Sequence, residues 1–457
     1  MCRYACSKVL LIALGCLVAS GCTSLSNSPD YLAQADSDRQ NVVSWSEMED
    51  GSETTYLNEL VNSGDLNALI AEARVASPDL RQTLLSLEIL RAQYRAIQAD
   101  QLPDVDAGLG ASKTEHLDTA YTGTLTISWE LDLWQKISDE ASAAAGDVAE
   151  QLALYQAARD TLVAEVMQGW LQLINLNRSV AIEKQRVELL EQNEQWILQR
   201  YRSGLGDLED LDSAQSSAAS ARATLIAVQE SLQQQQRAMN LLLGRRQGST
   251  VIASGYPQVL APLTGLPEQT LKRRPDLKAA YMAIRANDFR TSVAYKDMLP
   301  SISLEAALSD TGTSPGDALL RNPVWSLLGQ LTAPLFRGGE LQANADAAEL
   351  TTAQSYQTYR ETLLTAVKEV EDAIGQESSL GNQQQQIESA LLSARRNYQQ
   401  YQQKYRKGLV SVLDLLDVQQ QTFDLESQLN DLTYERLSNR ITLGLALGLG
   451  IKETDQS

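Results

Sequence analysis

The feature that most constrains the fold is an internal duplication. The second half of the chain repeats landmarks of the first half at a nearly constant shift. The repeated landmarks are Ser77-Pro78-Asp79-Leu80 with Arg274-Pro275-Asp276-Leu277, Leu102-Pro103 with Leu299-Pro300, and Tyr201-Arg-Ser-Gly204 with Tyr405-Arg-Lys-Gly408. The third shift is slightly larger than the first two, which are equal. A constant shift of this kind indicates two copies of one structural unit. The increase in the shift predicts a longer loop after Pro300 in the second copy.

The positions of the prolines indicate very long helices. Proline is absent from residues 104–256 and from all residues after Pro334, and proline breaks helix interiors. Within the first stretch, apolar residues keep a heptad spacing that is typical of a coiled-coil seam and is interrupted only at Gly169, Glu183 and Glu194. A helix over residues 135–202 would be about 100 Å long. Residues 201–207 and 405–411, which contain Gly204 and Gly408, are predicted to turn each long helix back as a hairpin.

Each copy also contains a pair of predicted strands. Residues 104–113 and 121–132 alternate between apolar and polar side chains, as do residues 302–308, and residues 324–333 do so more weakly because Leu328 falls on the other face. The period of two and the length match strands that cross a membrane at a tilt. The chain thus has hairpins at about 103–132 and 300–333. Four strands cannot close a barrel, and open edges are costly in hydrocarbon. Two chains would give a barrel filled by side chains, and three give twelve strands and a pore.

The amino terminus has the pattern of a lipoprotein signal. Arg3 and Lys8 precede a short apolar run that is too short to span a bilayer. The run ends in Ala19-Ser20-Gly21-Cys22, which predicts cleavage before Cys22 and a covalent lipid on its thiol. Cys22 would then be the only cysteine of the mature chain, so no disulfide and no cysteine metal site is expected. The residue after Cys22 is Thr23, whereas an Asp at this position would favour retention in the inner membrane. We therefore expect the lipoprotein to reach the outer membrane.

The composition argues against catalysis and against nucleic acid as a partner. The net charge of −20 offers no basic stripe for phosphates. The single histidine, His116, lies in the predicted turn of the first strand hairpin. One histidine is too few for a His-based triad or metal centre. We therefore predict that the chain is not an enzyme and holds no metal or other cofactor. Gly444 and Gly448 resemble a membrane helix-pairing motif, but short polar flanks favour close packing of a helix near the C-terminus.

These landmarks resemble the TolC/OprM family of outer-membrane factors, and its lipoprotein branch in particular. The resemblance rests on Cys22, both Pro-Asp-Leu and both Leu-Pro landmarks, and Tyr405-x-x-Gly408 followed by Leu413-Asp414-Leu415-Leu416-Asp417-x-Gln419. It implies an α+β fold, a homotrimer whose twelve-stranded membrane barrel continues as a periplasmic helical barrel. The implied segments are a signal peptide (1–21), a lipidated belt segment (22–56), the first repeat (57–244), an equatorial linker (245–266), the second repeat (267–448) and a tail (449–457).

The resemblance also implies a function and a gate. The family forms exit ducts for an inner-membrane transporter, with a periplasmic adaptor protein docked between them. Its gate maps onto Leu413, Asp414 and Asp417, and three copies of each carboxylate around an axis would form a cation-binding constriction. A solvated helix N-terminus is the alternative for each acid, since carboxylates favour that end. TolC-type members have an Arg where this chain has Val410, so their closed-state bonding is not assumed.

The first hairpin has four acids at the equivalent turn, which could make helix or adaptor contacts instead: Asp207, Glu209, Asp210 and Asp212. The residues expected to contact the adaptor are Tyr201, Arg202, Gly204, Asp210, Tyr405 and Gly408. A duct for small amphiphilic compounds is the favoured function. The alternatives are the same duct serving type I protein secretion or metal-ion export, and a non-transporting structural envelope lipoprotein.

Overall fold

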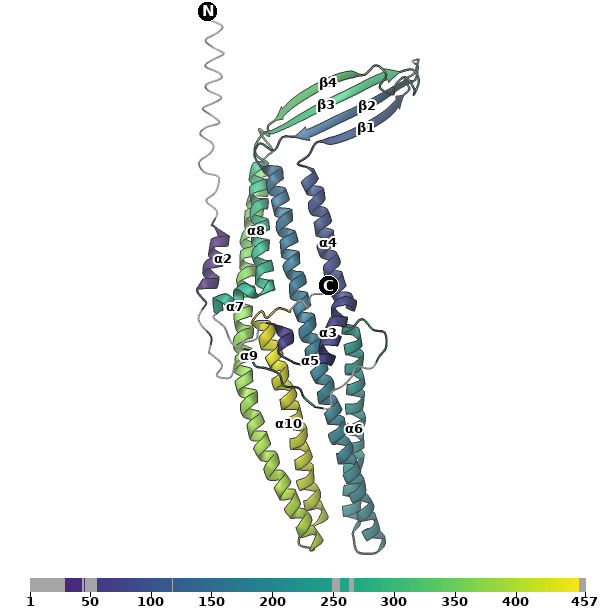
Figure 1. The fold of residues 1–457 in the computed structure, drawn as a ribbon, viewed down its shortest axis with the longest axis vertical. Coiled ribbons are helices and arrows are strands. Elements are labelled where there is room, and N and C mark those ends of the chain that lie inside the picture. The colour runs from purple at the N-terminus through teal and green to yellow at the C-terminus, as the bar shows by residue number, and fades with distance from the viewer. Residues whose placement is uncertain are drawn as a thin grey trace, which may run out of the picture. The chain divides into compact units, whose positions relative to one another are not determined.

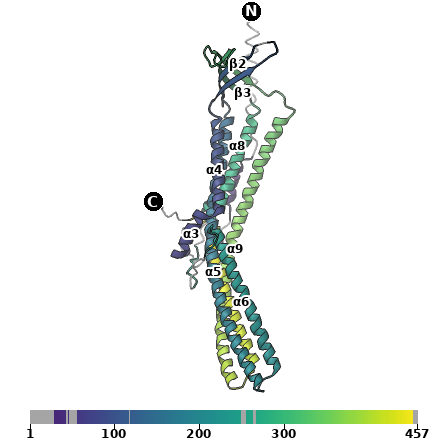
Figure 2. The same cartoon turned by 90° about the vertical axis from the view of Figure 1, so that its right-hand side faces the viewer.

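The computed structural model describes residues 29–42, 45, 56–116, 118–248, 255–262 and 267–451. They form two compact units (Figures 1 and 2). Unit 1 comprises Met1–Asn41, Ser86–Leu152 and Ala279–Glu361, and unit 2 comprises Val42–Leu85, Ala153–Lys278 and Thr362–Ser457. No helix within the described ranges is both long enough and apolar enough to cross a membrane. The predicted signal peptide and Cys22 lie outside the described residues.

The helices and strands repeat with matching lengths. The first copy contains α3 (Gly64–Ala76), α4 (Pro78–Ala99), β1 (Asp104–Ser112), β2 (Ala120–Glu130), α5 (Lys136–Arg202) and α6 (Leu208–Leu242). The second contains α7 (Pro267–Arg273), α8 (Pro275–Lys296), β3 (Ser301–Gly312), β4 (Val324–Thr332), α9 (Glu340–Arg406) and α10 (Val412–Ala446). Two short helices, α2 (Tyr31–Gln40) and η1 (Leu57–Glu59), precede them. Both α5 and α9 have 67 residues, and both α6 and α10 have 35.

The duplication predicted from the sequence is therefore confirmed in the fold. Helix α8 follows α4 by the smaller shift, the one that separates Pro78 from Pro275, and β4 follows β2 by the larger shift, the one that separates Gly204 from Gly408. The extra residues lie in the β3–β4 connection, where the longer loop was expected. The predicted helix over residues 135–202 is α5, and all four predicted strands form.

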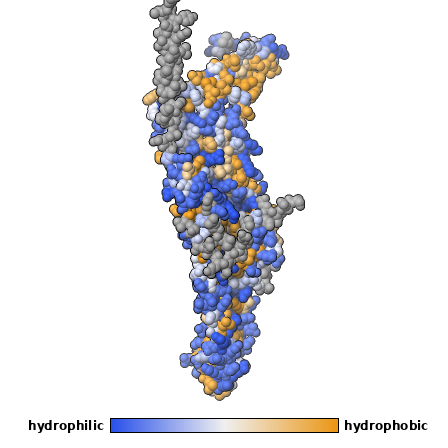
Figure 3. Space-filling view, turned by 60° about the vertical axis from the view of Figure 1, so that its left-hand side comes forward, coloured by the Kyte–Doolittle hydropathy of each residue, from blue (hydrophilic) through white to orange (hydrophobic). Residues whose placement is uncertain are grey.

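In unit 1 the strands form one antiparallel sheet in the order β1-β2-β3-β4. Val105 pairs with Ile127, Ile127 with Ala306, and Ala306 with Leu327. Because side chains alternate across a strand, these residues share one face, and that face is the apolar one predicted from the sequence. Apolar side chains gather over the strands in the space-filling view (Figure 3). The outer edges of β1 and β4 have no strand partner among the described residues.

The helices of unit 1 pack closely. A Cβ added at Gly146 of α5 would lie 2.9 Å from the Cβ of Ala286 in α8, so glycine is needed where these helices approach each other. Ion pairs between Asp139 and Lys296 and between Asp147 and Arg290 join the same two helices. Helix α2 is attached to α9 by the Tyr359 hydroxyl, which donates to the Ala35 carbonyl at 3.2 Å.

In unit 2 the helices form two hairpins, α5 with α6 and α9 with α10 (Figure 1). Seven of the nine apolar heptad positions are buried: Leu162, Val166, Leu173, Val180, Val187, Leu190 and Ile197. Leu176 is half-buried and Tyr201 is 41% exposed, so the predicted seam is confirmed except at Tyr201. Glu183, which interrupts the heptads, is buried beside Arg186 at 3.5 Å, and Arg186 donates to Asp424 of α10 at 2.9 Å. Burial raises the pKa of Glu183; the Asp424 charge adds to this rise, while Arg186 opposes it.

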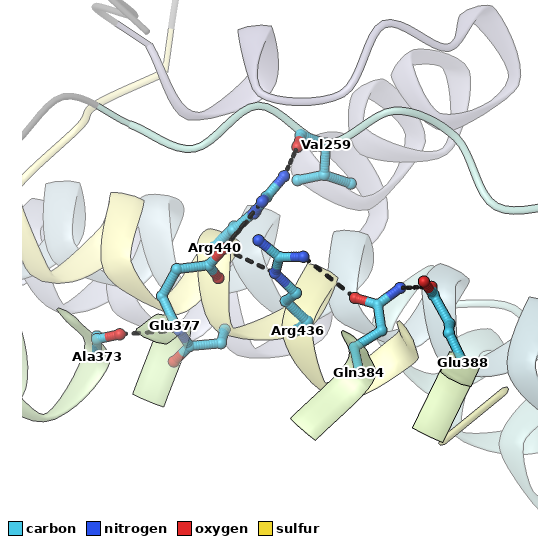
Figure 4. Close-up of polar contacts among 8 residues, drawn as sticks. Val259, Ala373, Glu377, Gln384, Glu388, Arg436 and Arg440 are labelled. Atoms are coloured by element: carbon cyan, nitrogen blue, oxygen red, sulfur yellow. Dashed lines mark hydrogen bonds and ion pairs between the residues drawn. The ribbon is translucent and has the colours of Figure 1, made fainter. Parts of the chain in front are cut away.

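A polar network fastens α10 to α9 and to the segment between the two copies (Figure 4). Arg436 and Arg440 of α10 both donate to Oε1 of Glu377 in α9, at 2.8–3.0 Å. Arg440 also donates through Nη1 to the carbonyl oxygen of Val259, at 2.6 Å. Glu377 is buried, so its charge requires such partners. The network therefore connects the inter-copy segment to the second hairpin.

The C-terminal end of α10 packs tightly around glycine. A Cβ at Gly444 would lie 2.8 Å from Leu60 Cδ1 and 3.1 Å from Leu57 Cδ1. Gly448 has a φ of +68°, which glycine adopts readily at a helix end. The close-packing interpretation of this glycine pair is confirmed.

Candidate functional site: the tips of the two helix hairpins

The first hairpin tip is a tight turn between α5 and α6. Gly204 has a φ of +70°, and the Leu205 amide donates to the Arg200 carbonyl at 2.9 Å, which closes the C-terminus of α5. Asp207 then caps α6 by accepting from the Asp210 amide at 2.9 Å. The turn leaves Leu205 72% exposed at its apex.

The second hairpin tip repeats this geometry at the equivalent turn of the second copy. Gly408 has a φ of +71°, and the Leu409 amide donates to the Lys404 carbonyl at 3.0 Å. Ser411 caps α10, and Leu409 is 69% exposed. Both tips thus present an exposed leucine beside a left-handed glycine, in agreement with the predicted turns.

The two acids of the predicted gate differ in what they bind. Asp414 belongs to a capping box: its amide donates to the Ser411 hydroxyl at 3.1 Å, and its carboxylate accepts from the Ser411 amide and hydroxyl at 2.9 and 2.6 Å. The Ser411 side chain first, and then its amide, hold the pKa of Asp414 below its usual value. Asp417 is exposed, and its carboxylate makes no hydrogen bond or ion pair within the described chain. The carboxylate of Asp417 is therefore the freer of the two.

Leu413 is half-buried and packs inside the chain's own hairpin pair. It contacts two apolar clusters, one around Val187 and Leu416 and the other around Ile197 and Val412. Its side chain therefore helps to join the two hairpins within one chain, in addition to any role in a gate.

A cavity of about 760 Å³ lies between the two hairpins near their tips. Its lining includes Trp196, Arg200, Asp210, Tyr398, Tyr405 and Gln419. Gln419 is buried and accepts from Asn193 at 3.3 Å, but its Nε2 has no hydrogen-bond partner. Burial raises the pKa of Tyr398. The cavity joins residues of both copies.

The structure brings together only some of the residues singled out in the sequence. Asp210, Tyr405 and Gly408 line the cavity, whereas Tyr201, Arg202, Gly204, Leu413, Asp414 and Asp417 do not. Arg200 was missed: its Nη1 donates to the Tyr405 hydroxyl at 3.4 Å, and its Nη2 donates to the Leu205 carbonyl at 3.1 Å. No local sequence pattern connects Arg200 with Tyr405, which lies 205 positions away.

The described ranges contain no group of three or more His, Cys, Asp or Glu side chains arranged to hold a metal ion. His116 lies in the β1–β2 connection, as expected, where its side chain is 89% exposed.

Comparison with known proteins decides what kind of protein presents these tips. The sequence profile described as "Outer membrane efflux protein" matches residues 69–245 and 266–449. The chain belongs to this family. The two matched segments together cover most of the chain, and each contains one strand hairpin and one long helix hairpin.

Curated relatives agree with this family. The chain is 30% identical over 397 residues to the cation efflux system protein CusC of Escherichia coli K12, covering 84% of this chain and 86% of the relative. It is 29% identical over 411 residues to the outer membrane protein OprJ of Pseudomonas aeruginosa, covering 85% of each. It is 27% identical over 395 residues to the probable outer membrane lipoprotein SilC of Salmonella typhimurium, covering 84% and 86%.

Solved structures show the same fold. A crystal structure of CusC matches with a TM-score of 0.80 at 26% identity, over 87% of this chain and 95% of that one. A membrane protein from Pseudomonas aeruginosa matches with a TM-score of 0.81 at 26% identity, over 89% and 100%. The predicted fold class, a trimeric membrane barrel continued by a helical barrel, is thereby confirmed. The protein is an outer-membrane efflux channel of a family of passive channels, with its helical barrel in the periplasm.

Proposed function

We propose that this channel is the passive exit duct of a tripartite efflux system, supplied by an inner-membrane transporter through a periplasmic adaptor protein. The observation that carries this proposal is the pair of matched apolar apices. Leu205 and Leu409 are 72% and 69% exposed and stand at equivalent turns of the two copies. The duplication thus places one exposed leucine at each tip, and a partner that contacts both tips would bury the two side chains. Tyr201, Arg202, Gly204, Asp210, Tyr405 and Gly408 surround these apices and form the proposed adaptor contact.

The test separates docking from conduction. Replacing both leucines with Asp should abolish efflux in cells, because the apolar contact with the adaptor is lost. Conductance of the purified channel in planar bilayers should stay unchanged. Loss of efflux together with normal conductance supports docking at the apices, whereas unaffected efflux contradicts it. A matched control is Leu241→Asp, since Leu241 is equally exposed, at 72%, but lies at the other end of α6.

We favour small amphiphilic compounds as cargo, with metal cations as the second candidate. The names of the relatives include both kinds of cargo. CusC is a cation efflux system protein. TtgF of Pseudomonas putida, 26% identical over 400 residues, is a toluene efflux pump outer membrane protein. A deletion strain should become sensitive to dyes and detergents and regain resistance when the gene is restored. Sensitivity to transition-metal salts alone would favour the cation alternative, and loss of a secreted protein would favour type I secretion.

The gate proposal retains Leu413, Asp414 and Asp417 but assigns them different tasks. Around a three-fold axis, Asp417 would supply free carboxylates that bind cations, since nothing in the described chain neutralises it. Asp414 would hold the start of α10 through its capping box. Leu413 would keep the two hairpins of one chain together through its two apolar clusters. We also propose that Cys22 is lipidated and that the covalent lipid is the only attached group.

A further inference from the structure

We infer that the cavity between the two helix hairpins, near their tips, binds a small planar aromatic acid that carries a second hydrogen-bond acceptor at its far end. The acid group would meet Arg200 and Arg406, and the far acceptor would take a hydrogen bond from Gln419. This site concerns neither the cargo of the duct nor its adaptor, so it goes beyond the proposed function.

The first observation is a buried donor without a partner. Gln419 of α10 lines the cavity and is only 3% exposed. Its Oε1 accepts from Asn193 at 3.3 Å, whereas its Nε2 has no hydrogen-bond partner. The corresponding residue of the first copy, Gln215, is exposed and donates to water instead. Because a buried N–H is costly to leave unpaired, we expect an acceptor in the cavity beside Nε2 of Gln419.

The charges of the lining favour an anion at the other end of the cavity. Arg200 and Arg406 carry the positive charges among the described lining residues, and Asp210 is the one acid there. The lining is thus net positive in a chain whose net charge is −20. Arg200 donates to the Tyr405 hydroxyl and to the Leu205 carbonyl, and these two bonds use only part of its donor set. A carboxylate is the acceptor that a guanidinium binds best in proteins, through paired hydrogen bonds.

Aromatic rings lie between these two ends. Trp196 of α5 is 61% exposed, and Tyr398 and Tyr405 of α9 also line the cavity. Such rings stack on flat aromatic ligands. The volume of about 760 Å³ is in the range of small-molecule sites. The middle of the cavity therefore suits a flat ring system.

The spacing of the two ends sets the length of the ligand. Asn193, which is bonded to Gln419, precedes Arg200 by two helical turns of α5, or about 10 Å. A naphthalene ring with substituents at opposite ends has a comparable length. An acid at one end of such a ring and a ketone at the other would reach both Arg200 and Gln419.

The site occurs once per chain because the duplication does not repeat it. The residues that correspond to Trp196, Arg200 and Tyr398 in the other copy are Gln400, Lys404 and Glu194. This exchange removes two aromatic rings and adds an acid that would repel a carboxylate. We therefore expect one ligand per chain.

Three compounds with the same ring system test the two ends separately. The compound 6-acetyl-2-naphthoate carries both the acid and the far acceptor, 2-naphthoate lacks the acceptor, and 2-acetylnaphthalene lacks the acid. Isothermal titration calorimetry of the purified trimer, with detergent micelles alone as the blank, should show one 6-acetyl-2-naphthoate per chain. We expect 2-naphthoate to bind about fivefold more weakly and 2-acetylnaphthalene about twentyfold more weakly. This comparison uses the unaltered protein, so it does not depend on the folding of any variant.

Variants then assign each end to its residues. Gln419→Leu should weaken 6-acetyl-2-naphthoate about fivefold and leave 2-naphthoate unchanged, since only the first compound offers the far acceptor. The matched control is Gln215→Leu, at the equivalent exposed position, which should change neither. Arg200→Gln combined with Arg406→Gln should weaken both naphthoates about twentyfold and leave 2-acetylnaphthalene unchanged.

The inference is overturned if no naphthoate binds beyond the micelle blank, or if Gln419→Leu affects both naphthoates equally. Equal binding by the unaltered protein and Gln419→Leu would overturn it too, because water alone would then meet Nε2. No adaptor is present in these titrations, so their failure would leave the docking proposal standing. A variant with Leu205→Asp and Leu409→Asp should in turn bind 6-acetyl-2-naphthoate normally, even if it loses efflux.

Discussion

Arg200 and Tyr405 join the two hairpin tips across the duplication: the guanidinium of one copy donates to the phenol hydroxyl of the other at 3.4 Å. Arg200 also donates to the Leu205 carbonyl at the apex of its own turn. One side chain therefore positions the first apex and ties it to the second hairpin.

Breaking this tie should loosen the tips. Arg200→Ala and Tyr405→Phe are each expected to raise the open fraction of the channel. The bond is long and exposed, so we expect about 0.5–1 kcal/mol, or a roughly two- to fivefold change in the opening equilibrium. Single-channel recordings of both variants and of the double variant give the coupling. Fully additive effects would show that the two side chains act separately.

Substitutions at the two gate acids, Asp414 and Asp417, should have different effects. Asp417→Asn should raise conductance and weaken block by Mg²⁺ without changing thermal stability, because it removes a free carboxylate. Asp414→Ala should instead destabilise the start of α10, since its side chain can no longer accept from the Ser411 amide and hydroxyl. Bilayer recordings and hydrogen exchange at residues 411–416 measure these effects. If Asp417→Asn retains wild-type conductance and block, the gate lies elsewhere, and Asp210 and Asp212 are the next candidates.

Asp160 should make stability depend on pH. Burial raises the pKa of Asp160 to about 6 from 3.8, with Arg159 opposing the shift. The folded chain then binds the proton more tightly, so stability falls as pH rises from about 4 to 6 and stays reduced above that. Asp160→Asn should therefore raise the melting temperature at pH 7.5 and leave it nearly unchanged at pH 4. Two pKa units correspond to at most about 3 kcal/mol, and partial exposure reduces this.

Two helical glycines should respond in opposite ways to alanine. Gly444→Ala should destabilise the channel, because the added methyl group would meet Leu57 and Leu60. Gly375→Ala is the matched control: no atom lies within 4 Å of the added Cβ in α9, so alanine should stabilise the helix by about 0.5–1 kcal/mol. Thermal unfolding in detergent compares them. A destabilising Gly375→Ala would mean that a neighbouring copy packs against this position.

Cys22→Ser should abolish lipidation and slow signal removal, because only the thiol accepts the lipid. Metabolic labelling with a radioactive fatty acid provides the measurement, and label retained by the Ser variant would contradict the assignment. Transport should persist, since the barrel itself anchors the trimer.

Much of the fold could be predicted because its signals are local and periodic. The absence of proline and the heptad spacing predict α5, because both depend only on helix geometry. The alternation of apolar and polar residues predicts β2, because it depends only on strand geometry. The capping role of Asp414 was within reach too, since Ser411-x-x-Asp414 has the spacing of a capping box. Residues that meet only through packing of the two hairpins could not be predicted. Arg200 with Tyr405 and Asn193 with Gln419 are separated by 205 and 226 positions, and no local pattern joins them.

The equal lengths of the repeated helices imply that the two hairpins must match each other in length. A seven-residue deletion confined to α5 and α6 would shorten the first hairpin by about 10 Å and leave the second unchanged. Leu205 and Leu409 could then no longer contact the same partner surface at the same time. The same deletion made in α9 and α10 as well would restore the match and retain the heptad seam. Selection on the length of such a duct would therefore act on both halves of the gene at once. An insertion in one hairpin would persist only with a matching insertion in the other.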